Sequence, residues 1–511
     1  MKRQIALHLS VIAVFAIVAY LNSFSNEFLY DDEHYVVNNP FIKDLSHLKE
    51  IFTTNIVAGS GQRSNFYRPL QLVAYLIVYH IFGLNIFGFH LLNLFLHLSN
   101  AFLIYFITLA LFSRKEISFA AALLFVVHPI HTEAITYMNG TADPLAACFG
   151  LLSLLLYLRS DRKMGCYLVS LICFAAALLS KETIVIVPLI IIALDLYRKE
   201  ALRRRVVRYI PYFCILFAYL LARLTIFNFT HSLNLFSESN IYTDHLSYRI
   251  YTFLAGLVEY YKLLLFPLYL KYDRALVVFI RPFTHLIVIS IFLLLSFAVL
   301  AYRSFRNKRI IFLGIIWFFI SLAPMSGIIP INGFAMEHWL YFPSIGFFII
   351  FSYSVMSRPR QNEFHPFSKK TCWVGKFSVS LLLVIAVIFT VLTRDRNEDW
   401  RDPITFYKTI LEHNPEIARV RNNLAISYTT RGMLGDAVEQ FQLAIALEDR
   451  YPESHYNLGL IYLKLGMNRE GILEFQRALA LDNDFQPSRR ALQEISEQLG
   501  MEEEAVGKSR R

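Results

Sequence analysis

The chain has 511 residues, of which 56% are hydrophobic and 17% are charged, whereas soluble proteins average roughly 45–50% and about 25%. This composition excludes a disordered protein, a collagen and a nucleic-acid-binding module. Residues 394–511 carry 16 basic and 20 acidic side chains, net −4, which leaves 33 basic and 19 acidic in 1–393, net +14. The sequence therefore predicts an all-α protein with a polytopic membrane domain over 1–393 and a small soluble domain over 394–511.

Twelve apolar segments precede residue 394. They lie near 5–21, 87–112, 117–137, 142–158, 165–180, 184–197, 209–227, 250–270, 284–302, 310–329, 338–356 and 374–393. Since a helix needs about 20 residues to cross the hydrocarbon, the shorter segments predict spans less clearly. The first segment is expected to be an uncleaved anchor, although Lys2, Arg3 and the apolar run also fit a signal peptide.

Basic clusters alternate with these segments and predict the sidedness. They are Lys2/Arg3, Arg114/Lys115, Arg159/Arg162/Lys163, Arg198 through Arg208, Arg303 through Arg309 and Arg358 through Lys370. The positive-inside rule places all six in the cytoplasm. Parity then requires one segment not to cross, and 250–270, which contains Glu259 and Lys262, is expected to be re-entrant or interfacial. We thus expect about 11 spans, a cytoplasmic amino terminus and an external carboxyl terminus, in a bacterial inner membrane with a periplasmic tail or in the endoplasmic reticulum.

A 34-residue period runs through the soluble tail. It relates Gly432, Gly466 and Gly500, as well as Leu424/Leu458/Leu492, Tyr428/Tyr462, Tyr407/Phe441/Phe475 and Ala444/Ala478. This spacing is typical of tetratricopeptide repeats, in which stacked helix pairs bury the faces that a single pair leaves exposed. We expect a half repeat, two repeats and a cap helix, with the Tyr and Phe positions in the core.

An acidic pair, Asp31-Asp32, follows the first apolar segment, and Tyr67-Arg68 leads into the apolar stretch 70–82. One interpretation is a solvated loop with helix-capping acids. The other is a carboxylate at the membrane surface that deprotonates a hydroxyl nucleophile, with Arg68 binding a phosphate.

Three further groups of polar residues are predicted at the external ends of apolar segments. Lys181-Glu182 occupies a short connection, either as a functional pair or as a mutual ion pair at a helix turn. Glu337-His338 and Tyr341 open the segment 338–356, where the aromatics are also typical of an interface belt. The third group is His128, His131 and Glu133.

No resident metal is predicted. His128, His131 and Glu133 are the set that could be forced into a divalent metal site, but no fourth ligand is apparent, and the two His are better interpreted as donors to an anionic lipid head group. The five Cys contain no CxxC pair, which also disfavours a zinc site or disulfide framework.

The chain resembles the transmembrane-and-tetratricopeptide O-mannosyltransferases and their prokaryotic relatives, which have the GT-C glycosyltransferase fold. The matching segments are FLYDDEHYVVNNP (28–40), NFYRPL (65–70), FGFHLLNLFLH (87–97), VVHPIHTEAITYMNG (126–140), LLSKETIVIV (178–187), MEHWLYFPSIGF (336–347) and RNEDW (396–400). The resemblance implies that Asp31 and Asp32 are the acidic motif of this fold. Two departures stand out: His338 replaces the Arg of an E-R-x-L-Y pattern, and only about two full repeats are present.

The expected activity is inverting transfer of mannose or another hexose from a polyprenyl-phosphate donor to a hydroxyl acceptor. Asp31 or Asp32 would be the base, and Asn423 and Asn457 in the repeats would contact a protein or peptide acceptor. The alternatives are a membrane-anchored scaffold that gathers partners on its repeats, and a transporter of lipid-linked sugars. A transporter needs polar groups deep in several spans, whereas here they are expected to crowd one side.

Overall fold

The computed structural model describes residues 2–229, 241–272, 277–330, 333, 335–357 and 369–509, and all of the regular secondary structure in these residues is helical. Side chains are described for all of these except 369–376 and 498–509. The chain forms two compact units, Met1–Arg401 and Asp402–Arg511. The predicted boundary at residue 393 lies within the last helix of the first unit, which continues to Glu398.

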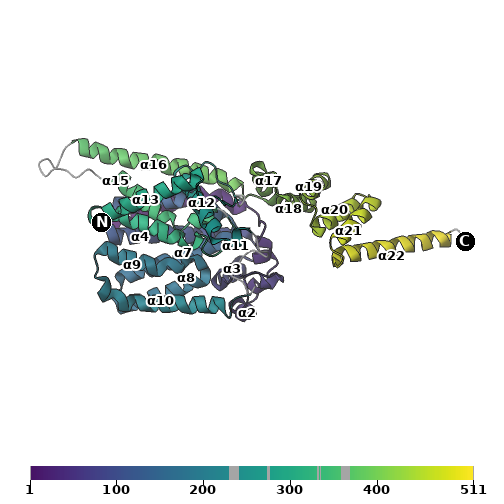
Figure 1. Ribbon diagram of the computed structural model, residues 1–511, viewed down its shortest axis with the longest axis horizontal. Helices are drawn as coiled ribbons and strands as arrows, with labels where there is room; N and C mark the ends of the chain where they lie inside the picture. Colours follow the sequence, from purple (N-terminus) through teal and green to yellow (C-terminus); the bar gives the residue numbers. More distant parts are fainter. Residues whose placement is uncertain are drawn as a thin grey trace. The chain divides into compact units, whose positions relative to one another are not determined.

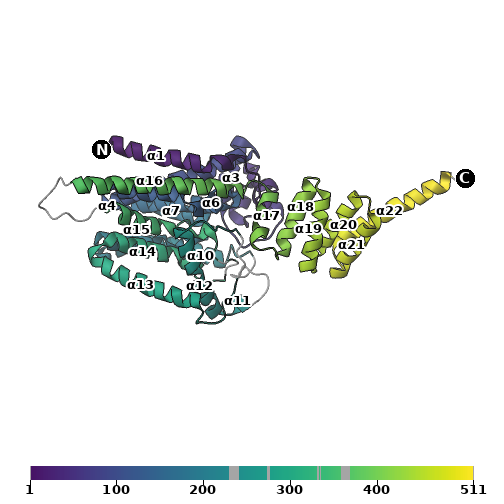
Figure 2. The same ribbon diagram turned by 90° about the horizontal axis from the view of Figure 1, so that it is seen from above.

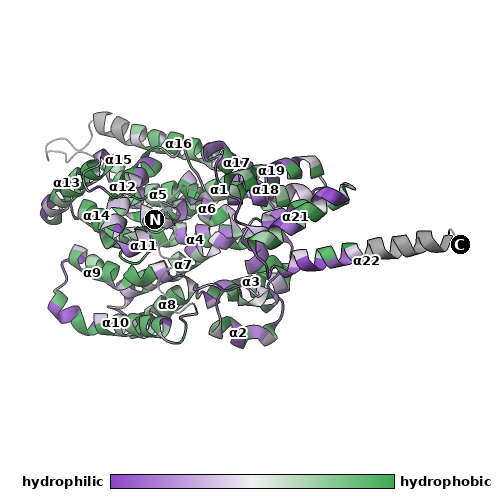
Figure 3. Ribbon diagram, turned by 45° about the vertical axis from the view of Figure 1, so that its right-hand side comes forward, coloured by the Kyte–Doolittle hydropathy of each residue, from purple (hydrophilic) through white to green (hydrophobic). Residues whose placement is uncertain are grey.

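The first unit is a bundle of roughly antiparallel helices (Figures 1 and 2). Its helices are α1 (Lys2–Tyr20), α2 (Leu48–Thr53), α3 (Pro69–Phe82), α4 (Ile86–Phe112), α5 (Lys115–Val127), α6 (Thr132–Thr136), α7 (Ala142–Arg159), α8 (Met164–Ser180), α9 (Val187–Arg198), α10 (Leu202–Leu224), α11 (Ile241–Asp244), α12 (Leu246–Leu265), α13 (His285–Asn307), α14 (Arg309–Leu322), α15 (Ser344–Met356) and α16 (Lys369–Glu398). The long helices are largely hydrophobic, while α2 carries many hydrophilic residues (Figure 3). This is the polytopic helical domain that the sequence predicts.

Six helices of this unit are long and apolar enough to cross a membrane, or seven if the bent pair Lys115–Val127 and Pro129–Thr136 is one span. Shorter apolar helices cover Pro69–Phe82, Met164–Ser180, Arg309–Met325 and Ser344–Met356. The predicted segments 184–197 and 250–270 are in neither group of the described helices. The count of 11 spans therefore stays a prediction.

Two contacts join α12 and the residues that follow it to the connection between α14 and α15. Near its start, Arg249 donates through Nε to the carbonyl of Gly327 at 2.7 Å. Beyond its end, the backbone N–H of Lys271 donates to Glu337. Because Gly327 and Glu337 belong to the same connection between α14 and α15, the start of α12 and the segment that follows its end both contact this connection. The expectation that 250–270 is re-entrant or interfacial stays a prediction.

The basic connections meet at one end of the unit. Lys115 donates through Nζ to Gln4 at 3.0 Å, and Arg114 donates to the carbonyl of Met356 at 3.1 Å. Arg309 donates to the carbonyl of Tyr197 at 3.0 Å. The cluster Arg358 through Lys370 lies outside the described side chains. The basic residues thus share one end of the unit, as the positive-inside pattern predicts for a membrane protein.

A broken helix crosses the centre of this unit. The chain bends by 53° between α5 and the segment Pro129–Thr136, because Pro129 has no N–H to continue the helix and disfavours helical geometry in His128 before it. The 3₁₀ turns η6 (Pro129–His131) and η7 (Met138–Thr141) follow before α7 begins. Such a break frees backbone carbonyls that an apolar environment would leave without partners.

A polar stripe on α4 supplies those partners. Asn93 donates through Nδ2 to the carbonyl of Ile135 at 3.0 Å, and Asn100 donates to that of Pro144 at 2.9 Å. His97 contacts the carbonyl of Val126 through Nε2 at 3.2 Å. With His90, these residues follow a spacing of three, four and three, which places them on one face of α4. The stripe holds the broken segment in place.

The second unit contains the predicted repeats. Its helices are α17 (Pro403–His413), α18 (Ala418–Thr430), α19 (Leu434–Leu447), α20 (Pro452–Lys464), α21 (Asn468–Leu481) and α22 (Gln486–Ser509). Gly432 and Gly466 adopt left-handed φ angles of 75° and 76° at equivalent turns. Tyr428, Phe441 and Phe475 are buried as predicted. The prediction was wrong for Tyr462, which is only half-buried because its hydroxyl accepts a hydrogen bond from Gln442 at the surface.

Replacing Asn93 with Leu is expected to destabilise the first unit. The carbonyl of Ile135 and the hydroxyl of Thr141, which donates to Asn93 Oδ1 at 2.6 Å, would both lose a buried partner, at a cost of about 1–3 kcal/mol. The midpoint of thermal unfolding in detergent measures this. Phe95→Leu, on the exposed face of the same helix, is the control, and equal midpoints for the two variants would contradict the role of the stripe.

The repeat unit is expected to lose stability as the pH rises. His455 lies 2.6 Å from both Asp449 and Glu474; burial alone would lower its pKa, but these carboxylates raise it above 6.5. A raised folded-state pKa gives stability that is full below pH 6.5 and is lost as the pH rises through the folded value. Protection factors of α20 and α21 from hydrogen exchange of the full chain should fall about tenfold between pH 6 and 8.5. His455→Gln should remove that dependence, and an unchanged profile would refute it.

Candidate active site

The acidic loop is tied to the broken helix by both of its carboxylates. Asp32 accepts the backbone N–H of Leu29 at Oδ2 and that of Asn139 at Oδ1, each at 2.9 Å. The side chain of Asn139 donates to Asp31 Oδ2 at 3.2 Å, and the backbone N–H of Asp31 donates to the Tyr137 hydroxyl at 3.2 Å. The segment 137–139 thus fixes both carboxylates.

The two carboxylates differ in access. Asp32 is 1% exposed, and this burial raises the pKa of its carboxyl well above the ordinary value, although its two backbone donors oppose the shift. Asp31 is half-buried. Tyr30, just before the pair, has a left-handed φ of 47°, a conformation that is costly for a bulky residue. The loop is therefore held to Asn139 through Asp32, while the Asp31 carboxylate stays partly accessible to solvent.

Gly140 allows the segment 137–141 to lie directly on α6. A Cβ atom at Gly140 would come within 2.7 Å of the Glu133 carbonyl oxygen and 2.9 Å of the Ala134 Cα, which is closer than Cβ atoms approach in proteins. On the other side of this segment, the Tyr137 ring stacks on Trp400 with centroids 5.3 Å apart, and Tyr272 meets Trp400 edge-on. Aromatic rings thus lie beside the Asp31 backbone.

Lys181 and Glu182 do not pair with each other. Lys181 contacts both oxygens of Asp143, at 2.8 and 2.7 Å, and this pair is almost fully buried. Glu182 receives two hydrogen bonds from Arg68, at 3.1 Å from Nε and 2.6 Å from Nη2. Burial would raise the pKa of Glu182, but Arg68 lowers it to about 2. The mutual ion pair considered from the sequence is therefore wrong, because each member has a different partner.

Tyr35 lies within electrostatic range of both the acidic loop and the Arg68–Glu182 pair. Burial raises the pKa of its hydroxyl, and the charges of Asp31, Arg68 and Glu182 all act on it. Arg68 is thus brought near the acidic loop but is already occupied by a carboxylate. Tyr67, the other predicted residue here, stacks on Phe227 with centroids 4.1 Å apart and donates to the carbonyl of Phe52.

Glu133, Glu337 and His338 form a second polar group. Glu133 Oε1 lies 2.6 Å from His338 Nδ1, and its Oε2 accepts the backbone N–H of His338 at 2.9 Å. Glu337 is 3.5 Å from Arg396 Nη2, and Arg396 also pairs with Asp399 at 2.6 Å. His338 keeps 22% of its side chain exposed, whereas Glu133, Glu337 and Arg396 are buried.

The remaining predicted residues lie in the core of the bundle. His128, at the helix break, contacts the carbonyl of Leu264 through Nε2 at 3.2 Å, and His131 lies 3.4 Å from the Ser344 hydroxyl. Tyr341 bonds with His97 at 2.8 Å and Asn100 at 3.0 Å. All three side chains are at most 1% exposed. They pack in the core around the break and do not contact Asp31.

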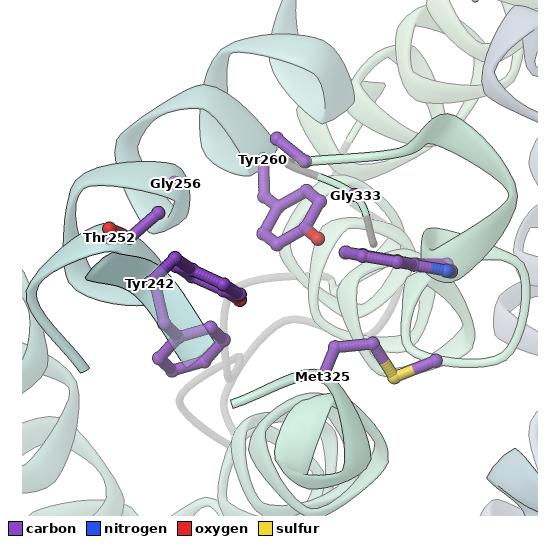
Figure 4. A pocket seen from close by; sticks show the side chains of 9 residues that line it. Tyr242, Thr252, Gly256, Tyr260, Met325 and Gly333 are labelled. Atoms are coloured by element: carbon purple, nitrogen blue, oxygen red, sulfur yellow. The ribbon is translucent and has the colours of Figure 1, made fainter. Parts of the chain in front are cut away.

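A pocket lies next to the second polar group. It is lined by Tyr242, Thr252, Phe253, Gly256, Tyr260, Met325, Gly333, Ala335 and Trp339. In Figure 4 the ring of Tyr260 and the thioether of Met325 face the space between them. Ala335, which has a left-handed φ of 50°, precedes Glu337. The lining is mainly apolar and aromatic.

Several residues of the site were not singled out from the sequence. They are Tyr137, Asn139, Asp143, Arg396 and Trp400, together with the stripe on α4. The spacing of His90, Asn93, His97 and Asn100 could have revealed the stripe, because polar residues repeat with a helical period in an apolar helix. Within the described part of the chain, no three His, Cys, Asp or Glu side chains are grouped to hold a metal ion.

Asn423 and Asn457 belong to the second unit. They occupy equivalent positions on α18 and α20, and both are half-buried. Their neighbours join the two repeats, since Ser454 donates to Asn422 Oδ1 at 3.0 Å.

Comparison with known proteins agrees with the resemblance stated from the sequence. Residues 69–226 match the family described as dolichyl-phosphate-mannose-protein mannosyltransferase, and 426–466 and 452–485 match tetratricopeptide repeats. Protein O-mannosyl-transferase F38B6.6 of Caenorhabditis elegans is 25% identical over 87% of this chain and 63% of its own length. Protein O-mannosyl-transferase TMTC1 of Homo sapiens is 26% identical over 85% of this chain and 54% of its own.

These matches confirm the predicted similarity to the transmembrane-and-tetratricopeptide O-mannosyltransferases. A shorter match to protein O-mannosyl-transferase TMTC2 of Mus musculus reaches 33% identity over 34% of this chain and 22% of that protein. The chain spans little more than half the length of the relatives that it matches throughout. The family segment 69–226 includes Lys181, Asp143 and Glu182 but neither the Asp31-Asp32 loop nor His338.

Removing one member of the Lys181–Asp143 pair is expected to cost about 3–5 kcal/mol, because an unpaired buried charge remains. Lys181→Met should therefore lower the thermal midpoint strongly. Lys181→Met with Asp143→Leu should recover a large part of the loss, since it removes both charges. A double variant no more stable than the single one would contradict a pairing role for these residues.

Proposed function

We propose that the chain is a glycosyltransferase that moves mannose or another hexose from a polyprenyl-phosphate donor to a hydroxyl acceptor at the membrane surface. The observation that carries this proposal is the half-buried Asp31 carboxylate, oriented by Asn139 and backed by the buried Asp32. Its relatives are named protein O-mannosyl-transferases, which supports the same class of reaction.

In the proposed reaction, Asp31 accepts the proton of the acceptor hydroxyl while that oxygen attacks the anomeric carbon from the face opposite the lipid phosphate. The bond between the anomeric carbon and the phosphate oxygen breaks, and its electron pair leaves with the phosphate. Inversion follows from this single displacement. A positioned base of this kind contributes about 10²–10⁴-fold.

The proposal assigns Asp32 a positioning role. Each of its two oxygens accepts a backbone N–H, from Leu29 and from Asn139, and the side chain is 1% exposed, so it is poorly accessible to an acceptor. Asp31 is thus the better candidate for the base, whereas the sequence alone leaves Asp31 and Asp32 open.

The proposed location is the end of the first unit opposite the basic connections. Asp31, Arg68 and Lys181 lie in connections that the charge pattern places outside the cytoplasm, and Glu133 and His338 lie near the external ends of the apolar segments 117–137 and 338–356. This crowding at one end favours an enzyme over a transporter. The donor would arrive on lipid from within the membrane. The acceptor would be a protein or peptide that the repeats help to bind, with Asn423 and Asn457 as contacts.

Asp31→Asn is expected to reduce transfer from a polyprenyl-phosphate hexose by about 10²–10⁴-fold while leaving the thermal midpoint nearly unchanged. Asp32→Asn should lower both the midpoint and the rate, because it weakens the acceptance of two backbone donors. Glu33→Gln, at the exposed neighbouring position, is the matched control. Near-wild-type transfer by both Asn variants would reduce the pair to a structural cap.

A further inference from the structure

Two neighbouring helices of the first unit, α8 and α10, each expose apolar side chains along one face. On α10 these are spaced three or four residues apart, at Val207, Ile210, Cys214, Phe217, Leu221 and Leu224. On α8 they are spaced by four residues, at Met164, Leu168 and Ile172. Such spacings place each set on a single helix face. In a protein that spans a membrane, exposed apolar faces of this kind contact lipid acyl chains.

The two helices lie side by side (Figure 1). The Tyr167 hydroxyl of α8 donates to the carbonyl of Arg208 in α10 at 2.9 Å, and the hydroxyls of Ser170 and Tyr212 are 2.6 Å apart. Both contacts join the first half of one helix to the first half of the other. Therefore α8 and α10 start beside each other and run in the same direction.

Four basic side chains, here called the basic surface, lie at these helix starts. Arg162 and Lys163 directly precede α8, and Arg203, followed by Arg204, lies one turn before the apolar face of α10. All four are exposed, and among the described residues their side chains make no hydrogen bond or ion pair. Since the helix dipole is also positive at a helix start, the helices themselves do not offset these charges.

The nearby acidic residues are engaged by other arginines. Asp161 joins the connection before α8 to the one before α10, through Arg198 at 3.1 Å and through Arg205 and Arg208 at 2.5 Å each. Burial would raise the pKa of the Asp161 carboxyl, but these guanidinium groups lower it. Glu200 pairs with Arg205 at 2.9 Å. Neither carboxylate is thus left to neutralise the basic surface.

The two connections carry a large positive charge. Residues 159–163 and 198–208 contain nine basic and two acidic side chains, net +7. The positive-inside pattern explains why basic residues lie at this end of the unit. It does not explain why Asp161 binds the two connections to each other, which brings like charges together against their repulsion. An anion bound among these charges would offset that repulsion.

We propose that the basic surface binds the head group of an anionic phospholipid, of which phosphatidylglycerol is the probe. The lipid phosphate lies among the four cations, and the acyl chains lie along the apolar faces of α8 and α10. A lipid is the occupant because the basic and apolar parts adjoin on the same two helices, as head groups and acyl chains do in a membrane leaflet. A soluble anion would contact only the basic part. The assignment does not depend on the sugar-transfer reaction.

The experiment measures lipid binding by the purified full chain in a neutral detergent. Native mass spectrometry gives dissociation constants for phosphatidylglycerol and for phosphatidylcholine with the same acyl chains. One basic side chain beside an anionic lipid strengthens binding about fivefold, so the wild type should bind phosphatidylglycerol at least about tenfold more tightly. Arg203→Gln with Arg204→Gln should weaken phosphatidylglycerol binding about fivefold or more and leave phosphatidylcholine binding unchanged. Arg162→Gln with Lys163→Gln repeats the test at the start of α8.

Two double variants are matched controls. Arg303→Gln with Arg306→Gln removes two exposed basic residues of α13, whose end lies at the same end of the unit because the adjoining Arg309 contacts the carbonyl of Tyr197. It should bind phosphatidylglycerol within about twofold of the wild type, because separated surface charges are screened by salt. Lysines in place of Arg203 and Arg204 keep the charge and should bind within about threefold of the wild type.

Loss of phosphatidylglycerol binding confined to the glutamine variants of α8 and α10 would support the proposal. Equal affinity of the wild type for the two lipids would overturn it. An equal loss in the α13 variant would also overturn it, because the effect would then come from diffuse surface charge. Glycerol phosphate that displaces the lipid as effectively as phosphatidylglycerol itself would exclude a lipid as the specific occupant.

Discussion

The arrangement depends on one constraint, which is that a helix broken in an apolar environment must find partners for its freed carbonyls. The stripe on α4 provides two of them: Asn93 donates to the carbonyl of Ile135, and His97 contacts that of Val126. Asn100 adds a bond to the carbonyl of Pro144 in α7. Once these bonds hold the segment, the backbone and side chain of Asn139 reach the acidic loop, and Glu133 reaches His338. Both polar groups of the candidate site therefore rest on the same short segment.

Ion pairing then distinguishes the charged residues that other side chains already occupy from those that a substrate could contact. Lys181 is occupied by Asp143, Arg68 by Glu182, and Arg396 by Glu337 and Asp399. These pairs satisfy charges that burial would otherwise make costly. Asp31 keeps partial exposure, while Asp32 beside it is buried. A base is a role that the proposed displacement needs, and Asp31 is the residue best placed to fill it.

The sequence predicts most reliably what depends on local chemistry. The 34-residue period gives the helix pairs of the second unit, and the acidic pair after the first apolar segment gives Asp31 and Asp32. The partner of a buried charged residue is harder to predict, because it depends on where other helices place their side chains. Adjacent Lys181 and Glu182 pair with Asp143 and Arg68, and His128 and His131, whose spacing favours lipid contact, are buried. Asn139 contacts Asp32, and Arg396 contacts Glu337 besides its near neighbour Asp399. The partners Asp32 and Glu337 are more than 50 positions away in the sequence, so no local pattern marks these contacts.

The most direct test of the account is the side on which transfer occurs. The chain can be reconstituted in vesicles that contain a polyprenyl-phosphate hexose, with orientation determined by protease access to the repeats. A membrane-impermeant acceptor peptide is then added to one face at a time. The account predicts glycosylated peptide only when the acceptor shares the face of the Asp31 loop and the repeats. Transfer confined to the face of the basic connections would contradict it.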